Sequence, residues 1–170
     1  MLGSSDGGLS LAAKFGLKFA FAGQLNPRQD VQLLKQYKHR FEAKGHEEKP
    51  YSILSKFIFV ADTEEEAKLA ALPAEISWMR MYKGSKTEEL QLISVEEAAN
   101  YEFTPLELAI REQNKGRFII GNPEQVKTQI QELERTALID DYICQSMWYC
   151  RGTRTLCHFG LVGYLKGKVR

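Results

Sequence analysis

The sequence predicts an α/β fold built around a parallel sheet. Short runs of strand length are apolar on both faces, which is typical of strands covered by helices. Segments with helix-start signals lie between these runs, so strand and helix alternate along the chain. The four expected strands are Phe19–Ala22, Ile53–Val60, Phe118–Ile120 and Tyr142–Trp148.

Helix starts are marked by a polar residue that can cap the first turn, followed by Pro or by Glu three residues later. Signals of this kind begin at Asn26, Asp62, Ser94, Thr104 and Asn122. Apolar residues recur at helical spacing after the first and the last of them. The signals at Ser94 and Thr104 have the pattern of capping boxes. We therefore expect helices to begin at or beside these residues.

The alternation is interrupted by residues 72–116, an acidic segment that we expect to be a mostly helical insertion. Pro73 is expected to break or kink the helix that begins at Asp62, because proline lacks the N–H that a helix interior needs. The basic tail, residues 150–170, carries several glycines, and each interior glycine costs a helix about 1 kcal/mol relative to alanine. At this length we expect one domain, residues 1–170.

Composition indicates a folded soluble protein, with 44% hydrophobic and 26% charged residues. The net charge of +1 and the absence of a recognisable RNA-binding motif argue against a nucleic-acid partner. No apolar run reaches the roughly 18 residues that a membrane span needs. Cys144, Cys150 and Cys157 are odd in number and lack the close spacing of a zinc site, so we expect a reducing, cytoplasmic setting and no metal.

The start of the chain carries a candidate binding turn. Gly3–Gly8, of sequence GSSDGG, leads directly into a small helical stripe of Leu9, Ala12 and Ala13 that Gly16 closes. A Gly/Ser-rich turn before a helix offers backbone N–H groups, hydroxyls and the positive helix end to an anion, usually a phosphate. The alternative is purely structural, with one serine as a helix cap and the two later glycines as a turn.

Six pieces of the sequence, in the same order, resemble bacterial luciferase-like flavin-dependent monooxygenases. Together they cover the chain from residue 2 to about residue 142. The pieces are Leu2–Ser5, Leu11–Leu17, Phe19–Ala22, Asn26-Pro27, Phe59–Ala67 and Ile119–Val126.

The resemblance implies the C-terminal half of a (β/α)8 TIM-type barrel that works with reduced FMN and molecular oxygen on a small organic substrate. In that family a serine-rich turn after the fifth strand contacts the flavin phosphate. This role falls on Ser4 and Ser5. It extends to the backbone of Asp6, Gly7 and Gly8, and to Ala22 at the end of the next strand. No catalytic residue is assigned by the resemblance.

A complete barrel of this type needs about 250 residues, so we interpret the chain as a truncated barrel. Two functions therefore stay open. One is an FMN-dependent monooxygenase, with stand-alone activity in question because the first barrel half is missing. The other is a non-catalytic remnant or interaction module that pairs through an open sheet edge. We expect a homodimer or a complementing N-terminal half as the partner.

Overall fold

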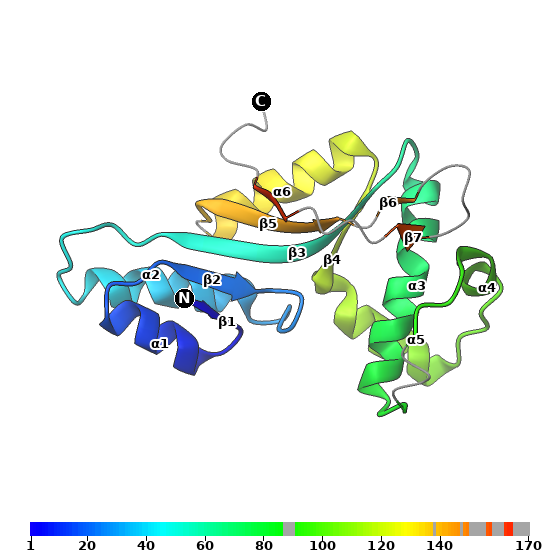
Figure 1. Cartoon of the computed structure of the whole chain (residues 1–170), viewed down its shortest axis with the longest axis horizontal. Helices are drawn as coiled ribbons and strands as arrows, with labels where there is room; N and C mark the ends of the chain where they lie inside the picture. Colours follow the sequence, from blue (N-terminus) through cyan, green and yellow to red (C-terminus); the bar gives the residue numbers. More distant parts are fainter. Residues whose placement is uncertain (87–90, 138, 147, 150–155, 158–161, 165–170) are drawn as a thin grey trace.

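The computed structural model describes residues 1–86, 91–137, 139–146, 148–149, 156–157 and 162–164. Strands and helices alternate through its first half, and three helices follow one another in the middle (Figure 1). The elements are β1 (Leu2–Gly3), α1 (Asp6–Lys14), β2 (Phe19–Ala22), α2 (Asp30–Glu42), β3 (Ser52–Val60), α3 (Glu64–Tyr82), α4 (Val95–Ala99), α5 (Pro105–Asn114), the 3-10 turn η2 (Lys115–Arg117), β4 (Phe118–Gly121), α6 (Pro123–Ala137), β5 (Asp141–Ser146), β6 (Trp148–Tyr149), β7 (Leu156–Cys157) and β8 (Val162–Tyr164).

The main sheet has the strand order β1-β2-β3-β5-β8, and β4 pairs with the end of β3. All pairings from β1 to β5 are parallel, as is the pairing of β3 with β4, whereas β8 is antiparallel. This confirms the predicted α/β fold with a parallel sheet. The expected strand at 19–22 has the predicted bounds, and the others agree to within two residues at each end.

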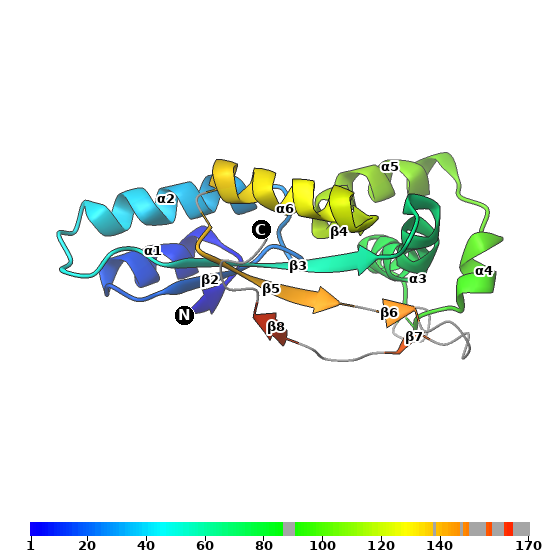
Figure 2. The ribbon, with the colours of Figure 1, turned by 90° about the horizontal axis from the view of Figure 1, so that it is seen from above.

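The two faces of the sheet are covered unequally. Pairing aligns Gly3, Phe21, Leu54 and Tyr142 in one row, and the last three of these are buried in the largest core cluster together with residues of α1, α2 and α6. Figure 2 shows α2 and α6 on the same side of β3 and β5. The next row, on the opposite face, contains Leu2, Ala20 and Ile53, of which Leu2 is 68% exposed. The helices α1, α2 and α6 therefore cover one face of this sheet. On the other face, α3 covers only the end of β3, where Phe57 and Phe59 pack against its alanines.

Two expected helix features are corrected by the structure. The helix expected from Asn26 begins at Asp30, because the Asn26 side chain donates to the Ser4 carbonyl and to Gln29 instead of capping a helix. Pro73 does not break its helix, since α3 continues to Tyr82, and the alternative of a kink at Pro73 stays a prediction. Pro73 is itself buried, and α3 buries Ile76 and Met79 beyond it, so packing offsets the hydrogen bond that proline removes.

The predicted capping boxes at Ser94 and Thr104 are both confirmed, and each begins a helix of the middle segment. Glu107 does more than close the second box. Its Oε1 accepts from Lys83 Nζ at 2.7 Å and from the Tyr101 hydroxyl at 3.0 Å, while Oε2 accepts from the Thr104 N–H at 2.9 Å. A single buried carboxylate therefore connects α5, the end of α3 and the loop before α5.

Most of the tail, 150–170, lies outside the described residues, and so do Cys150 and His158. Among the described helices, none is both long enough and apolar enough to cross a membrane.

Acid titration tests the Glu107 network. The Lys83 ammonium and the donors of Thr104 lower the pKa of Glu107 to about 2. A carboxyl whose pKa is lowered by folding adds stability that is complete above its unfolded pKa, about 4.5, and lost as pH falls through the folded value. We expect Glu107→Gln to be less stable than wild type at pH 7, with a difference that shrinks between pH 4.5 and 2. Urea unfolding across this range measures it, with the exposed Glu102→Gln as control. A difference that stayed constant with pH would contradict the role of the charge.

Close packing at Gly23 gives a second prediction. A Cβ on Gly23 would lie 2.7 Å from Leu54 Cδ1 and 2.9 Å from the Ser55 carbonyl oxygen. We expect Gly23→Ala to lower the free energy of unfolding by about 1–3 kcal/mol, the usual cost of overpacking. Gly7→Ala is the control, because Gly7 is helical and its added Cβ would meet only Ser5 Oγ, at 3.9 Å. Denaturant unfolding of both variants decides, and equal stability of the two would contradict the prediction.

Candidate functional site

Parallel pairing places the carboxyl ends of β1, β2, β3 and β5 at one edge of the sheet. Binding sites of parallel α/β proteins form at this edge, because the loops that follow the strands converge there. The segment after β1 is the Ser4-Ser5 turn, and the segment after β2 is the loop 23–29. Gly3 pairs with Phe21, so the residues that follow each of them, Ser4 and Ala22, emerge next to one another.

Ser5 occupies the N-cap position of α1 in an extended conformation, with φ −139° and ψ 164°, but its side chain makes no capping hydrogen bond. Gly7 and Gly8 belong to the first turn of α1, so the alternative that they form a separate turn is wrong. The N–H groups of a first helical turn have no acceptor inside the helix. Ser5 and these N–H groups therefore lie at the positive end of α1, and Ser4 precedes them by one residue.

Gly3 and Gly8 face one another where the helix start lies beside the strand. A Cβ on Gly3 would come within 3.6 Å of the Gly8 Cα, and one on Gly8 within 3.7 Å of the Gly3 Cα. The Phe19 ring lies 3.4 Å from the same Gly3 position. These are ordinary van der Waals distances, so a methyl group at either position would fit beside the helix start and the ring.

Asp6 begins α1 and carries the only acidic side chain of the Ser4–Gly8 turn. Its Oδ1 forms an ion pair of 2.8 Å with Arg40 of α2, and its Oδ2 accepts from the Ser10 hydroxyl at 3.3 Å. Arg40 also donates to Ser10, at 2.6 Å. The Arg40 charge thus offsets the carboxylate that stands at the helix start. Sequence reasoning missed Arg40, because no local pattern relates it to a residue 34 positions earlier.

The loop after β2 is fastened to the serine turn by Asn26. The Ala22 carbonyl accepts from the N–H groups of Leu25 and Asn26, at 2.9 and 3.3 Å, which curls the loop back over the strand end. The Asn26 side chain then donates to the Ser4 carbonyl at 3.0 Å. The structure therefore places Ala22 and Ser4 at neighbouring strand ends, and Asn26 connects the two segments that follow.

A second group of residues supports this loop from the other side. Arg117, at the end of η2, is 1% exposed and donates to the Gln24 carbonyl, the Tyr82 hydroxyl and Asn114 Oδ1. Nearby, Lys56 of β3 donates to the Gly116 carbonyl and forms a buried ion pair with Asp30. Sequence reasoning found neither cation, because a Lys inside an apolar strand and an Arg before one give no motif.

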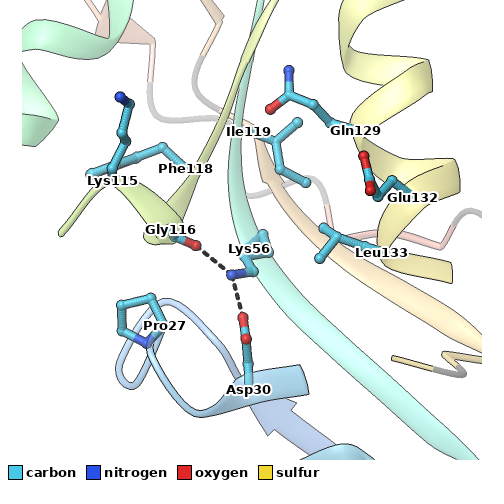
Figure 3. Close-up of a pocket in the computed structure, with 10 residues that line it drawn as sticks. All are labelled: Pro27, Asp30, Lys56, Lys115, Gly116, Phe118, Ile119, Gln129, Glu132 and Leu133. Carbon is cyan, nitrogen blue, oxygen red and sulfur yellow. Dashed lines mark hydrogen bonds and ion pairs between the residues drawn. The ribbon is translucent and has the colours of Figure 1, made fainter. Parts of the chain in front are cut away.

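A pocket of about 470 Å³ opens beside these buried cations, on the helix-covered side of the sheet. Figure 3 shows Lys56 at its centre, between the Gly116 carbonyl and Asp30. None of the predicted site residues lines it. The lining residues are Pro27, Asp30, Lys56, Lys115, Gly116, Phe118, Ile119, Gln129, Glu132 and Leu133. In the described part of the chain, no three His, Cys, Asp or Glu side chains lie together as metal ligands would.

Comparison with known proteins gives the family. The sequence profile of the luciferase-like monooxygenases matches residues 1–139. A luciferase-like monooxygenase of Escherichia coli K12 is 27% identical over 141 residues, which are 83% of this chain and 41% of that protein. The uncharacterized protein YceB of Bacillus subtilis strain 168 is 29% identical over 133 residues, or 78% of this chain and 39% of YceB. The chain thus spans about two fifths of the length of these curated relatives.

Solved structures share the fold. The crystal structure of apo-MsnO8 superposes with a TM-score of 0.71 at 23% identity, over 86% of this chain and 44% of that one. The oxygenating constituent of 3,6-diketocamphane monooxygenase from Pseudomonas putida, a type II Baeyer-Villiger monooxygenase solved with FMN, superposes with a TM-score of 0.53 at 17% identity. It is matched over 81% of this chain and 38% of its own. With the profile covering most of its length, this chain belongs to the luciferase-like monooxygenase family.

Proposed function

We propose that this chain forms the flavin-phosphate-binding part of an FMN-dependent, luciferase-like monooxygenase, and the C-terminal part of its (β/α)8 barrel. The observation that carries the proposal is the start of α1 at the carboxyl edge of the sheet. Two serines and the N–H groups of a first helical turn meet there without a capping bond from Ser5. Family membership supports the same conclusion, as does the FMN complex of the diketocamphane enzyme.

In this proposal the hydroxyls of Ser4 and Ser5 donate to phosphate oxygens, together with the backbone N–H groups of Asp6, Gly7 and Gly8. Hydrogen bonds to a charged acceptor are stronger than neutral ones, and the helix end adds its positive potential. Arg40 holds the Asp6 carboxylate to the side through its 2.8 Å ion pair, which reduces the repulsion between that carboxylate and a phosphate. Ala22, only 4% exposed, forms part of the wall beside Ser4.

The reduced isoalloxazine ring, once bound, supplies the chemistry that splits molecular oxygen and puts one atom into a small organic substrate. In this proposal, Ser4, Ser5 and the start of α1 bind the flavin by its phosphate and thereby orient its ring. They do not include an acid or base for the oxygen chemistry. We propose a reducing compartment such as the cytoplasm as the setting, which fits three cysteines and a reduced flavin.

A partner that covers the sheet is the second part of the proposal. β1 stands at the end of the sheet order, and on its uncovered face Leu2 is 68% exposed. Leu11 of α1 and Phe15, which caps the end of that helix, lie four residues apart and are 49% and 61% exposed. Unpaired strand edges with apolar neighbours invite association with another chain. A second copy or a complementing N-terminal barrel half would cover them. The alternative function, a non-catalytic interaction module, depends on this surface alone.

Flavin titration of Ser4→Ala/Ser5→Ala tests the phosphate role. Each hydroxyl donor to a charged group is worth roughly 1.5–3 kcal/mol, so FMN affinity is expected to fall by at least about tenfold. Riboflavin, which lacks the phosphate, should bind this variant about as well as it binds wild type. Ser94→Ala, which removes the cap of α4, is the matched control and should change stability without changing the FMN-to-riboflavin ratio. Equal losses for both flavins in the double variant would reject the phosphate role.

Size-exclusion chromatography with light scattering tests the partner surface. We expect the wild-type chain to self-associate when no partner is present, because water contacts Leu2, Leu11 and Phe15 in the monomer. The variant Leu11→Glu/Phe15→Glu should shift it toward monomer, whereas Leu106→Glu/Leu108→Glu, on exposed positions of α5, should not. A wild-type chain that stays monomeric at high concentration would count against the proposal.

A further inference from the structure

Arg117 is a buried guanidinium whose hydrogen-bond partners in the described part of the chain are all neutral. Its Nε donates to Asn114 Oδ1 at 2.8 Å, and its two terminal nitrogens donate to the Gln24 carbonyl and the Tyr82 hydroxyl. The group lies over the Trp78 ring at 4.4 Å and over the Tyr82 ring at 4.9 Å. Within the described residues, none of its ion pairs or hydrogen bonds involves a carboxylate.

If Arg117 had only a structural role, burying its charge would cost the protein stability. A buried charge loses its hydration, and burial accordingly lowers the pKa of Arg117. An apolar side chain of similar volume would fill the same space without that loss. An apolar side chain could not, however, hold three elements in a fixed geometry. The planar guanidinium can, because it directs several hydrogen-bond donors from one rigid group.

The carbonyl that Arg117 holds belongs to the loop between β2 and α2. Two residues later in this loop, Asn26 donates to the Ser4 carbonyl at 3.0 Å. The segment around Arg117 also contacts the end of this loop and the start of α2. Lys56 donates to the Gly116 carbonyl and pairs with Asp30, and a Cβ on Gly116 would come within 3.4 Å of Pro27. The loop is therefore fastened to η2 on one side and to the serine turn on the other.

We propose that Arg117 is a positioning residue for the cofactor site, fixing the β2–α2 loop so that Asn26 holds the Ser4-Ser5 turn in place. This inference rests on the proposed function, because it deepens the phosphate role of that turn. Tyr82 and Trp78 belong to α3, so the same contact connects the helices α3–α5 to the turn. Arg117 acts through Gln24, Asn26 and Ser4, and does not itself touch the flavin.

Two readouts separate this role from general stabilisation. Amide hydrogen exchange reports on residues 23–26 and 4–8 in the chain without ligand, and paired titrations report the FMN-to-riboflavin affinity ratio. In Arg117→Met we expect faster exchange in both segments and a loss of about fivefold or more in FMN affinity, as for one lost hydrogen bond, with riboflavin affected little. Asn26→Ala should speed exchange in residues 4–8 and lower the same ratio. Combining the two substitutions should lower it no further, because they break one connection.

Arg111→Met is the matched control. Arg111 lies in the same helical region, pairs with Glu75 at 2.6 Å and stacks on Phe103, with no recorded contact to the loop. We expect it to lower stability and leave exchange in residues 4–8 and the affinity ratio unchanged. Should Arg117→Met fail to fold, Arg117→Lys replaces it, since it keeps the charge and loses the planar group.

The outcomes are distinguishable from those of the proposed function. A folded Arg117 variant with wild-type exchange in residues 4–8 overturns the positioning role, even if FMN binds. A wild-type chain without preference for FMN over riboflavin overturns the phosphate role, and exchange alone then decides whether Arg117 fixes the turn. An Arg111 variant with the same exchange pattern as the Arg117 variant reduces Arg117 to ordinary packing and also overturns the inference.

Discussion

Parallel pairing of β1, β2, β3 and β5 is the constraint on which the rest of the structure depends. A parallel pair cannot be joined by a tight hairpin, so each strand must return through a helix. The helices α1, α2 and α6 meet this need and bury one face of the sheet. The same pairing delivers every strand end to one edge, where the serine turn and the β2–α2 loop come together. The position of the site is thus set by the common direction of the strands, and its side chains only complete it.

Features that depend on a few neighbouring residues could be predicted from the sequence. The strand at 19–22 and the capping boxes at Ser94 and Thr104 have the expected positions, because apolar runs and caps are local signals. The Gly/Ser-rich segment at the start of the chain is a local signal of the same kind, and the structure puts it at the start of α1. The contacts of Ser4 and Ser5 with a phosphate stay a prediction.

Features that depend on distant contacts could not be predicted. Asn26 resembles a helix cap in sequence, but its side chain donates a hydrogen bond to the carbonyl of Ser4, a residue 22 positions earlier. Pro73 resembles a helix end, yet α3 continues because the apolar residues beyond it are buried. Arg40, Lys56 and Arg117 are ordinary charged residues in the sequence. Each becomes part of the site only when partners 26 to 93 residues away along the chain fold against it.

The nine-residue strand β3 is the central strand of the main sheet and needs neighbours on both of its edges. One edge of β3 pairs with β2 and, further along, with β4, and the other edge pairs with β5. Ile53 must wait for Asp141, a residue 88 positions later, before its second neighbour exists. Contacts at such separation are slow to form, because a long loop must close first. While the ribosome adds residues 61–140, the second edge of β3 is bare, and α3, α4 and α5 are made during that interval. α3 packs against Phe57 and Phe59, so the segment made in this interval covers part of a face of β3 before the second edge is paired.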